Sequence, residues 1–125
     1  MSDSILAMRQ AAEQGNAWAQ HDLGVAYDNG QGVAQDAKQA VAWYRKAAKQ
    51  GHAMAQNNLG ANYFYGEGVP QDVQQAYVWF SVAAANGYTD AAQNRDAIAK
   101  RLTPAALNEW QALATRHFAQ YQPKP

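Results

Sequence analysis

The chain has 125 residues, 48% of them hydrophobic and 16% charged, which is enough apolar material for one folded domain and excludes an intrinsically disordered chain. Ten lysines and arginines balance ten aspartates and glutamates, so the chain lacks the basic surplus that is typical of nucleic-acid-binding domains. Cysteine is absent, which excludes disulfides, a thiol nucleophile and cysteine-based zinc sites.

No apolar run approaches the ~18 residues that a membrane-spanning helix needs, so we expect no membrane insertion. Residues 1–9 have neither a basic segment nor a long apolar core, and they do not resemble a signal peptide. This favours the cytoplasm for the chain as given. A mature protein that has lost a signal peptide and begins with an added Met would look the same, which leaves the periplasm open.

The first predicted elements are a helix over residues 4–15 and a helix over Ala17–Asp28. The second of these has Asn16 as its N-cap and carries apolar residues at helical spacing. Gly24 stands in the middle of this helix, where glycine costs roughly 0.5–1 kcal/mol relative to alanine. Because Gly60 holds the matching place later in the chain, we predict that both glycines allow two helices to approach closely.

Glycine-rich loops follow, and each loop ends in an aspartate that begins the next helix. Gly30 and Gly66 fit the left-handed residue that ends a helix. Asp36 and Asp72 each precede a glutamine by three residues, which is the spacing of a capping box. The helices that start there carry a broad apolar stripe, which must pack against a neighbour to be buried.

The C-terminal part departs from this pattern. Thr89–Leu102 is predicted to be helical, but no glycine-rich loop follows it. Thr103 as N-cap and Pro104 at the first helical position begin a last helix with one apolar face. We expect these two helices to form a capping hairpin that ends a repeat array, and residues 122–125 to form a frayed tail.

Two stretches of the chain match each other at a constant offset. The matched pairs lie 36 residues apart and include Leu23 with Leu59, Tyr27 with Tyr63, and Asp36 with Asp72. A fixed period of this length is typical of solenoids of stacked helices, because a two-helix unit cannot bury its own apolar stripe. A third full repeat is not expected, since Arg95, Asp96 and Ala99 stand where it would need Leu, Gly and Tyr.

The ordered pattern Ala-x-Ala-Gln-x-x-Leu-Gly-x-x-Tyr-x-x-Gly-x-Gly-Val-x-x-Asp, followed by Ala-x-x-Trp-aromatic-x-x-Ala-Ala-x-x-Gly, resembles the Sel-one-like repeat. It is complete in residues 17–51 and again in residues 53–87. The resemblance implies an all-α fold, an α/α right-handed superhelix or solenoid of antiparallel helix pairs that is tetratricopeptide-like. It also implies a non-enzymatic adaptor or scaffold that binds proteins or peptides on its concave face.

We therefore expect a single repeat domain over residues 1–125. Its expected parts, in chain order, are a partial repeat helix (4–15), repeat one (16–51), repeat two (52–87) and the capping hairpin (88–121). Positions that match between the repeats build the fold, so function is expected where the copies differ on the exposed face of the first helices.

On that face, amide side chains could hold the backbone of an extended peptide, and apolar side chains could form pockets beside them. The binding candidates are Trp18, His21, Asp22, Val25, Asn57, Asn58, Ala61, Tyr65, Gln93 and Asn94. The wider face adds Asn29, Met54, Asp90, Ala97 and Arg101. The expected partner is a protein or an extended peptide, with no cofactor and no nucleic acid. An ordinary solvated helix face is the alternative interpretation.

Two other functions stay open. Weak self-association through the N-terminal helix is one, because the face of Ile5, Leu6 and Met8 lacks the partner helix of a complete repeat. A cell-wall-fragment-binding or hydrolytic enzyme is the other, since the resemblance extends to relatives proposed to act on cell-wall fragments and β-lactams. Those relatives resemble a disulfide-clamped version, and this chain has no cysteine.

Neither catalytic residues nor a metal site are expected. The sequence has no nucleophile elbow, no His-Glu-x-x-His motif and no phosphate-binding loop. His21, His52 and His117 are far apart in the sequence and lack ligand spacing, so structural or surface roles are expected for them.

Overall fold

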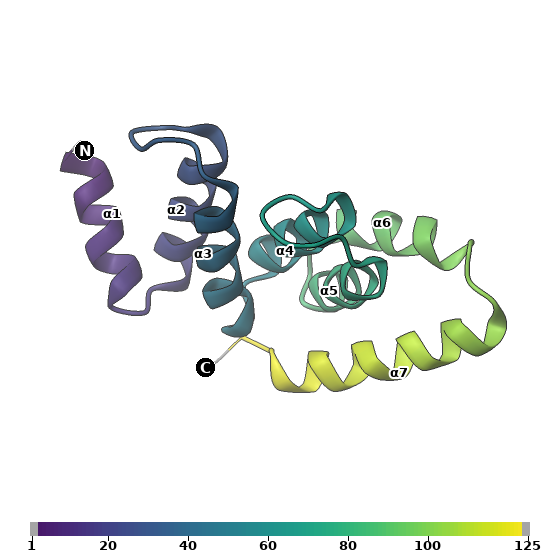
Figure 1. Ribbon diagram of the computed structural model, residues 1–125. Coiled ribbons are helices and arrows are strands. Elements are labelled where there is room, and N and C mark those ends of the chain that lie inside the picture. The colour runs from purple at the N-terminus through teal and green to yellow at the C-terminus, as the bar shows by residue number, and fades with distance from the viewer. Residues whose placement is uncertain (1–2, 124–125) are drawn as a thin grey trace.

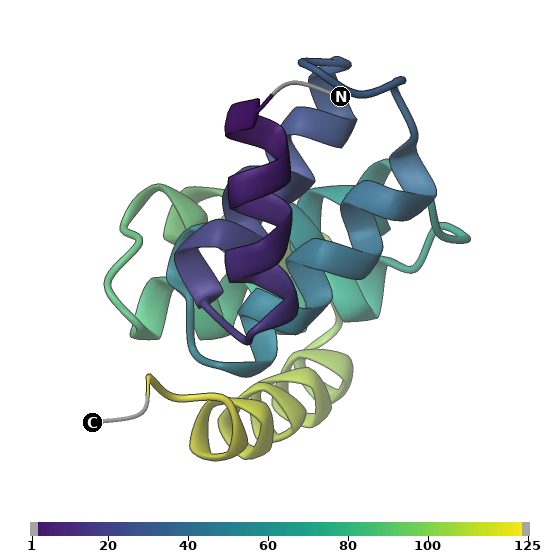
Figure 2. The same ribbon diagram turned by 90° about the vertical axis from the view of Figure 1, so that its left-hand side faces the viewer.

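The computed structural model describes residues 3–123, and this range contains seven α-helices and no β-strand, which confirms the predicted all-α repeat solenoid (Figure 1). The helices, in chain order, are α1 (Asp3–Glu13), α2 (Ala17–Asn29), α3 (Ala37–Lys49), α4 (Ala53–Tyr65), α5 (Val73–Ala85), α6 (Asp90–Ala99) and α7 (Pro104–Gln120). Each of the helices from α1 to α5 packs against the next one in the chain. In both views α7 lies along one side of this array (Figure 2).

The helix boundaries follow the predicted caps. Asn16 accepts a hydrogen bond from the Ala19 N–H at 2.9 Å, and Asp72 accepts one from the Gln75 N–H at 3.0 Å. Asp36 accepts from the N–H groups of Lys38 and Gln39, and Thr103 from that of Ala106. Gly30 and Gly66 adopt left-handed conformations with φ of 67° and 70° and end α2 and α4.

The core lies between the helices of each pair and is built from residues that recur in both copies. Leu23 and Leu59 are fully buried. So are the small alanines that let the helices come together, which are Ala40, Ala47, Ala76 and Ala83. A Cβ atom added to Gly24 would lie 2.6 Å from the Tyr44 ring, and one added to Gly60 would lie 2.7 Å from the Phe80 ring. The predicted close approach at both glycines is confirmed.

Successive helix pairs are joined by polar contacts that also recur. Arg45 donates a hydrogen bond to the Tyr63 hydroxyl at 2.8 Å and lies over the Tyr63 ring. Arg9 makes the same two contacts with Tyr27. These contacts tie the second helix of one unit to the first helix of the next, so they hold neighbouring units in register.

The last two helices do not form the close hairpin that the sequence predicts. Helix α7 diverges from α6 and packs mainly against α5, where Tyr77 contacts Trp110 and Trp79 stacks on Tyr121 at 5.3 Å between ring centroids. The physical reason is that α6 has lost the apolar residues of the repeat and forms the Arg95–Asp96 ion pair instead. The aromatic residues of α7 therefore find their apolar partners on α5.

The segment after α7 turns back towards the helix array. The Tyr121 carbonyl accepts hydrogen bonds from the side chains of Gln56 and Asn86, and Pro123 lies against Gly51. Gln122 and Pro123 are exposed and residues 124–125 lie outside the described range, so the frayed tail over residues 122–125 stays a prediction. These contacts bring residues 121–123 to the junction between α3 and α4 (Figure 1).

Candidate functional site

The candidate surface is the face formed by the first helices α2, α4 and α6. Among the predicted binding residues, the exposed ones are Trp18, Asp22, Tyr65, Gln93 and Asn94. The half-buried ones are Val25, Asn57, Asn58 and Ala61. The wider set of Asn29, Met54, Asp90, Ala97 and Arg101 is exposed. His21 differs, because it is only 5% exposed, and the expectation that it stands on the surface is wrong.

The amides on this face link one first helix to the next. Asn58 on α4 donates to His21 Nε2 on α2 at 3.1 Å. Asn94 on α6 donates to the Asn57 side-chain oxygen at 3.4 Å. Each link joins residues 37 positions apart, which is one repeat plus one residue. The polar row is therefore held in place by its own hydrogen bonds, and the remaining amide groups face outward in a fixed arrangement.

His21, His52 and Trp18 form a ring cluster that the sequence does not predict. The imidazoles of His21 and His52 stack at 4.8 Å between centroids, and the Trp18 ring meets His52 edge-on at 4.5 Å. His21 Nε2 accepts from Asn58, so its Nδ1 carries the proton and donates to Asp22 at 3.2 Å. The only sequence signal is that His52 occupies the repeat position of the N-cap Asn16.

His52 acts as the N-cap of α4 and must be neutral to do so. Its Nδ1 accepts a hydrogen bond from the Ala55 N–H at 3.2 Å, which a protonated nitrogen could not do. Burial, followed by the proximity of His21, lowers the pKa of His52 to about 4, while Asp22 opposes the shift. The cluster therefore favours an uncharged His52 at neutral pH.

This pKa predicts a loss of stability in weak acid. An unfolded histidine titrates near 6.5, so the contribution of His52 to the free energy of unfolding is complete above that pH and is lost as the pH falls from about 6.5 to about 4. Because solvent screens a partly exposed ring, we expect a loss of about 1–2 kcal/mol rather than the full value of the shift.

The matched variant is His52→Asn, which places the first repeat's own N-cap residue at this position and does not titrate. Urea unfolding of both proteins, measured from neutral pH to about pH 4, gives the difference in pH dependence. Parallel curves for the wild type and the variant would contradict a role for His52.

A hollow lies between α4, α5 and α6, and we name it the α4–α6 pocket. Its volume is about 690 Å³. The apolar part of the lining consists of Ala61, Phe64, Val73, Phe80, Ala97, Ile98 and Leu102. The residues with polar groups are Tyr65, Gln71, Asn94 and Arg101. The predicted candidates Ala61, Tyr65 and Asn94 thus meet in one place, on the face that the sequence selects.

The apolar floor of this pocket exists because the two repeats differ. In repeat one the corresponding floor positions are Asp28 and Tyr44, and the Tyr44 hydroxyl donates to the Asp28 carboxylate at 2.6 Å. Burial, followed by the hydrogen bond to Asp28, raises the pKa of Tyr44 well above its usual value, so the hydroxyl keeps its proton. In repeat two the same positions are Phe64 and Phe80, which leave no polar group to satisfy.

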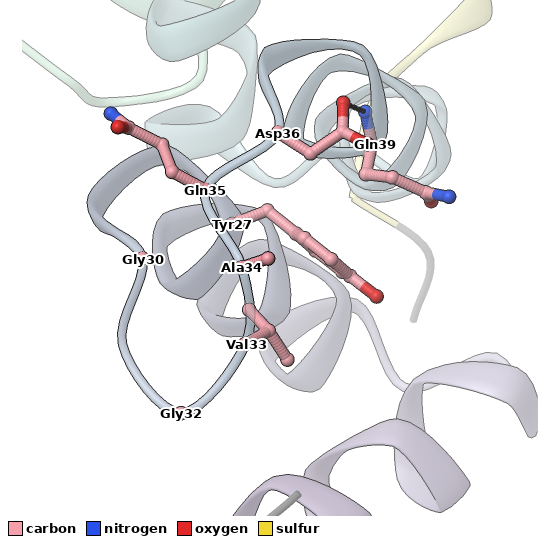
Figure 3. A pocket seen from close by; sticks show the side chains of 8 residues that line it. All are labelled: Tyr27, Gly30, Gly32, Val33, Ala34, Gln35, Asp36 and Gln39. Atoms are coloured by element: carbon pink, nitrogen blue, oxygen red, sulfur yellow. Dashed lines mark hydrogen bonds between the residues drawn. The ribbon is translucent and has the colours of Figure 1, made fainter.

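Beside the loop of repeat one lies another hollow, which is open to solvent and has a volume of about 670 Å³ (Figure 3). Val33 and Ala34 lie beside the Tyr27 ring, and the Asp36 side chain caps the helix at Gln39. All of the lining residues except Ala34 recur 36 positions later in the chain. This hollow is therefore built from residues that form the repeat, and it does not distinguish one copy from the other.

Metal binding and membrane insertion can also be checked against the described part of the chain. Within residues 3–123, no group of three or more histidine, aspartate or glutamate side chains is placed to share a metal ion. None of the helices in that range is long and apolar enough to cross a lipid bilayer.

Comparison with known proteins identifies relatives of the same architecture. The model of the Sel1 repeat family matches residues 8–16, 19–52 and 53–88, which together make up more than half of the chain. A comparison with curated proteins gave no match. Sel1 repeat proteins are generally scaffolds for protein–protein interaction, and their fold is typically non-enzymatic.

Two solved structures are similar to this chain. One is a protective antigen of uropathogenic Escherichia coli strains with an SLR fold, which is 39% identical with a TM-score of 0.88 over 94% of this chain and 25% of its own. The other is a Sel1 repeat protein from Oxalobacter formigenes, 39% identical with a TM-score of 0.70 over 71% of this chain and 67% of its own. The present chain thus spans a quarter of the length of the first. With the family model matched over most of its helices, the chain belongs to the Sel1 repeat family.

Proposed function

We propose that the protein is a scaffold that binds a protein or an extended peptide through the face of α2, α4 and α6. The observation that carries this proposal is the exposure of large apolar side chains on that face. Trp18 is 64% exposed, Tyr65 is 68% exposed and Met54 is 38% exposed. Side chains of this kind are enriched at the centres of protein interfaces, where they supply apolar contact area.

The arrangement of the amides supports the same function. The chain already uses side-chain amides to hold a distant backbone carbonyl, since Gln56 and Asn86 both donate to the Tyr121 carbonyl, at 3.0 and 3.2 Å. The side-chain amides of Asn57 and Gln93 could likewise donate hydrogen bonds to backbone carbonyls of a partner. Hydrogen bonds between helices already hold this face, so the scaffold loses little conformational entropy when a flexible segment binds.

The test is a selection from a displayed peptide library on the wild-type protein, followed by affinity measurements with the enriched peptides. A double change, Trp18→Ala with Tyr65→Ala, is expected to weaken binding about tenfold or more, because each exposed aromatic at an interface centre can contribute over 1 kcal/mol. Both side chains are exposed, so the fold should be retained. Asn58 is a poorer choice for substitution, because its loss would leave Nε2 of the buried His21 without its hydrogen-bond donor.

Leu6→Ala is the matched control, because Leu6 is 45% exposed on α1 and lies outside the proposed face. Its affinity for the enriched peptides should equal that of the wild type. Unchanged binding in the double variant, or an equal loss in the control, would place the interaction elsewhere on the molecule.

Self-association through α1 is a second candidate, favoured by the exposure of Leu6 alone. Ile5 is only 6% exposed and Met8 is half-buried, so the expectation that all three residues form an open face is wrong for Ile5. Sedimentation at rising protein concentration tests this candidate. A dimer that Leu6→Glu abolishes would support it, and a monomer at all concentrations would remove it.

A further inference from the structure

The α4–α6 pocket has the properties of a site for one large apolar side chain. Its volume of about 690 Å³ lies within the range of pockets that take small organic ligands. Its floor rings, Phe64 and Phe80, carry no polar atom, so an apolar group could enter without leaving a hydrogen-bonding group unpaired. The matching floor of repeat one carries the polar Tyr44–Asp28 hydrogen bond, so the apolar floor is a feature of repeat two.

The rim of the pocket carries a positive charge that the fold does not use. Arg101 is the one charged residue in the lining, and no carboxylate lines the pocket. Arg101 is exposed, and none of the ion pairs among residues 3–123 involves it. A guanidinium at the edge of an apolar hollow attracts an anionic group that stands next to a buried apolar one.

The occupant is further restricted by what surrounds the rim. Tyr65 is 68% exposed beside the hollow, and Asn94 presents an amide on its α6 side. An aromatic or large aliphatic side chain could enter between them, while the backbone that carries it passes along the amides of the first helices. Such an occupant belongs to a peptide rather than to a free ion or a nucleic acid.

We propose that the α4–α6 pocket binds an aromatic or large aliphatic side chain of a partner peptide, with an adjacent aspartate or glutamate that pairs with Arg101. This inference rests on the proposed function and adds to it the place and the chemical character of the bound segment. The apolar side chain supplies the contact area, and the charge pair selects acidic sequences over basic ones.

The first experiment uses small probes and does not require a known partner. Indole-3-propionate, tryptamine and 3-methylindole present the same ring with a negative charge, a positive charge and no charge. Titrated into nitrogen-15-labelled protein, indole-3-propionate should shift the amide signals of Tyr65, Ala97 and Ile98. It should bind about fivefold more tightly than tryptamine, which is the scale of an exposed ion pair.

Arg101→Glu should abolish or reverse this preference, and the matched control Arg116→Glu, the same charge change at an exposed position of α7, should leave it intact. No shift at the three amides, or the same preference in Arg101→Glu, would overturn the proposed site.

The second experiment separates a failure of this pocket from a failure of the proposed function. Ala97 is exposed and lines the pocket, so Ala97→Trp should fill the hollow without disturbing the core. Peptides enriched on the wild type should carry an acidic residue beside an aromatic or aliphatic one and should lose affinity for Ala97→Trp. If they bind this variant as tightly, the pocket inference is overturned while the proposed function stands. A library that enriches no peptide would overturn the proposed function and this partner with it.

Discussion

Gly68→Ala is expected to lower the free energy of unfolding by about 3 kcal/mol or more. Gly68 has a φ of 75°, a conformation that costs an L-residue about 1–2 kcal/mol. A Cβ atom there would also meet the carbonyl oxygen of Ala37 and lie 2.7 Å from its carbonyl carbon. Ala37 is the first residue of α3, and this backbone cannot move without disturbing the Asp36 cap.

Gly87→Ala is the matched control for the strain of a positive φ. Gly87 has a φ of 105°, but a Cβ atom there would meet nothing within 4 Å. This variant should lose only about 1–2 kcal/mol. Denaturant unfolding of both variants at one pH measures the difference. Equal losses would show that the contact between the loop of repeat two and α3 is loose in solution.

Gln56→Ala is expected to destabilise the protein by about 3 kcal/mol and to release the end of α7. Gln56 is fully buried, donates to the carbonyls of Ala48 and Tyr121 at 2.9 and 3.0 Å, and accepts from Asn86 at 3.0 Å. Truncation would leave these groups without their partner and add a cavity, and each buried unpaired group costs about 1–3 kcal/mol.

Gln20→Ala is the matched control, which shows how much of the lost stability comes from releasing the end of α7. Gln20 holds the same repeat position, donates to the Ala12 carbonyl at 3.0 Å and accepts from Gln50 at 2.8 Å, but within residues 3–123 it has no hydrogen bond to the segment after α7. Both variants should lose stability. Only Gln56→Ala should increase amide hydrogen exchange in the last turn of α7. The same exchange pattern in both variants would mean that α7 is held by its aromatic contacts alone.

Much of the architecture could be predicted from the sequence because its causes are local or are repeated. The helix caps accept hydrogen bonds from N–H groups two or three residues away, as Asn16, Asp36 and Asp72 do. Their role can therefore be predicted from the local sequence. The role of Gly24 and Gly60 could be predicted because glycine destabilises the interior of a helix, and it occurs twice at the same position of the repeat. Periodicity at 36 residues then implied that the units stack.

The candidate face was predicted in part. Trp18 and Tyr65 are exposed on the first helices as expected, but His21 is turned inward, where it stacks on His52 and accepts from Asn58. Spacing in the sequence does not predict this contact, because the two histidines are 31 residues apart and belong to different repeats. Their contact depends on how far one first helix is displaced from the next.

By itself, the sequence determined the helices, their caps, the repeat and the family, since each of these depends on residues that are near in the chain or recur at one period. Only the tertiary structure decided the path of α7, the histidine stack and the α4–α6 pocket. The physical reason is that these features arise from the stacking distance and angle between helices. That geometry is the sum of many weak packing contacts, and no single spacing in the chain encodes it.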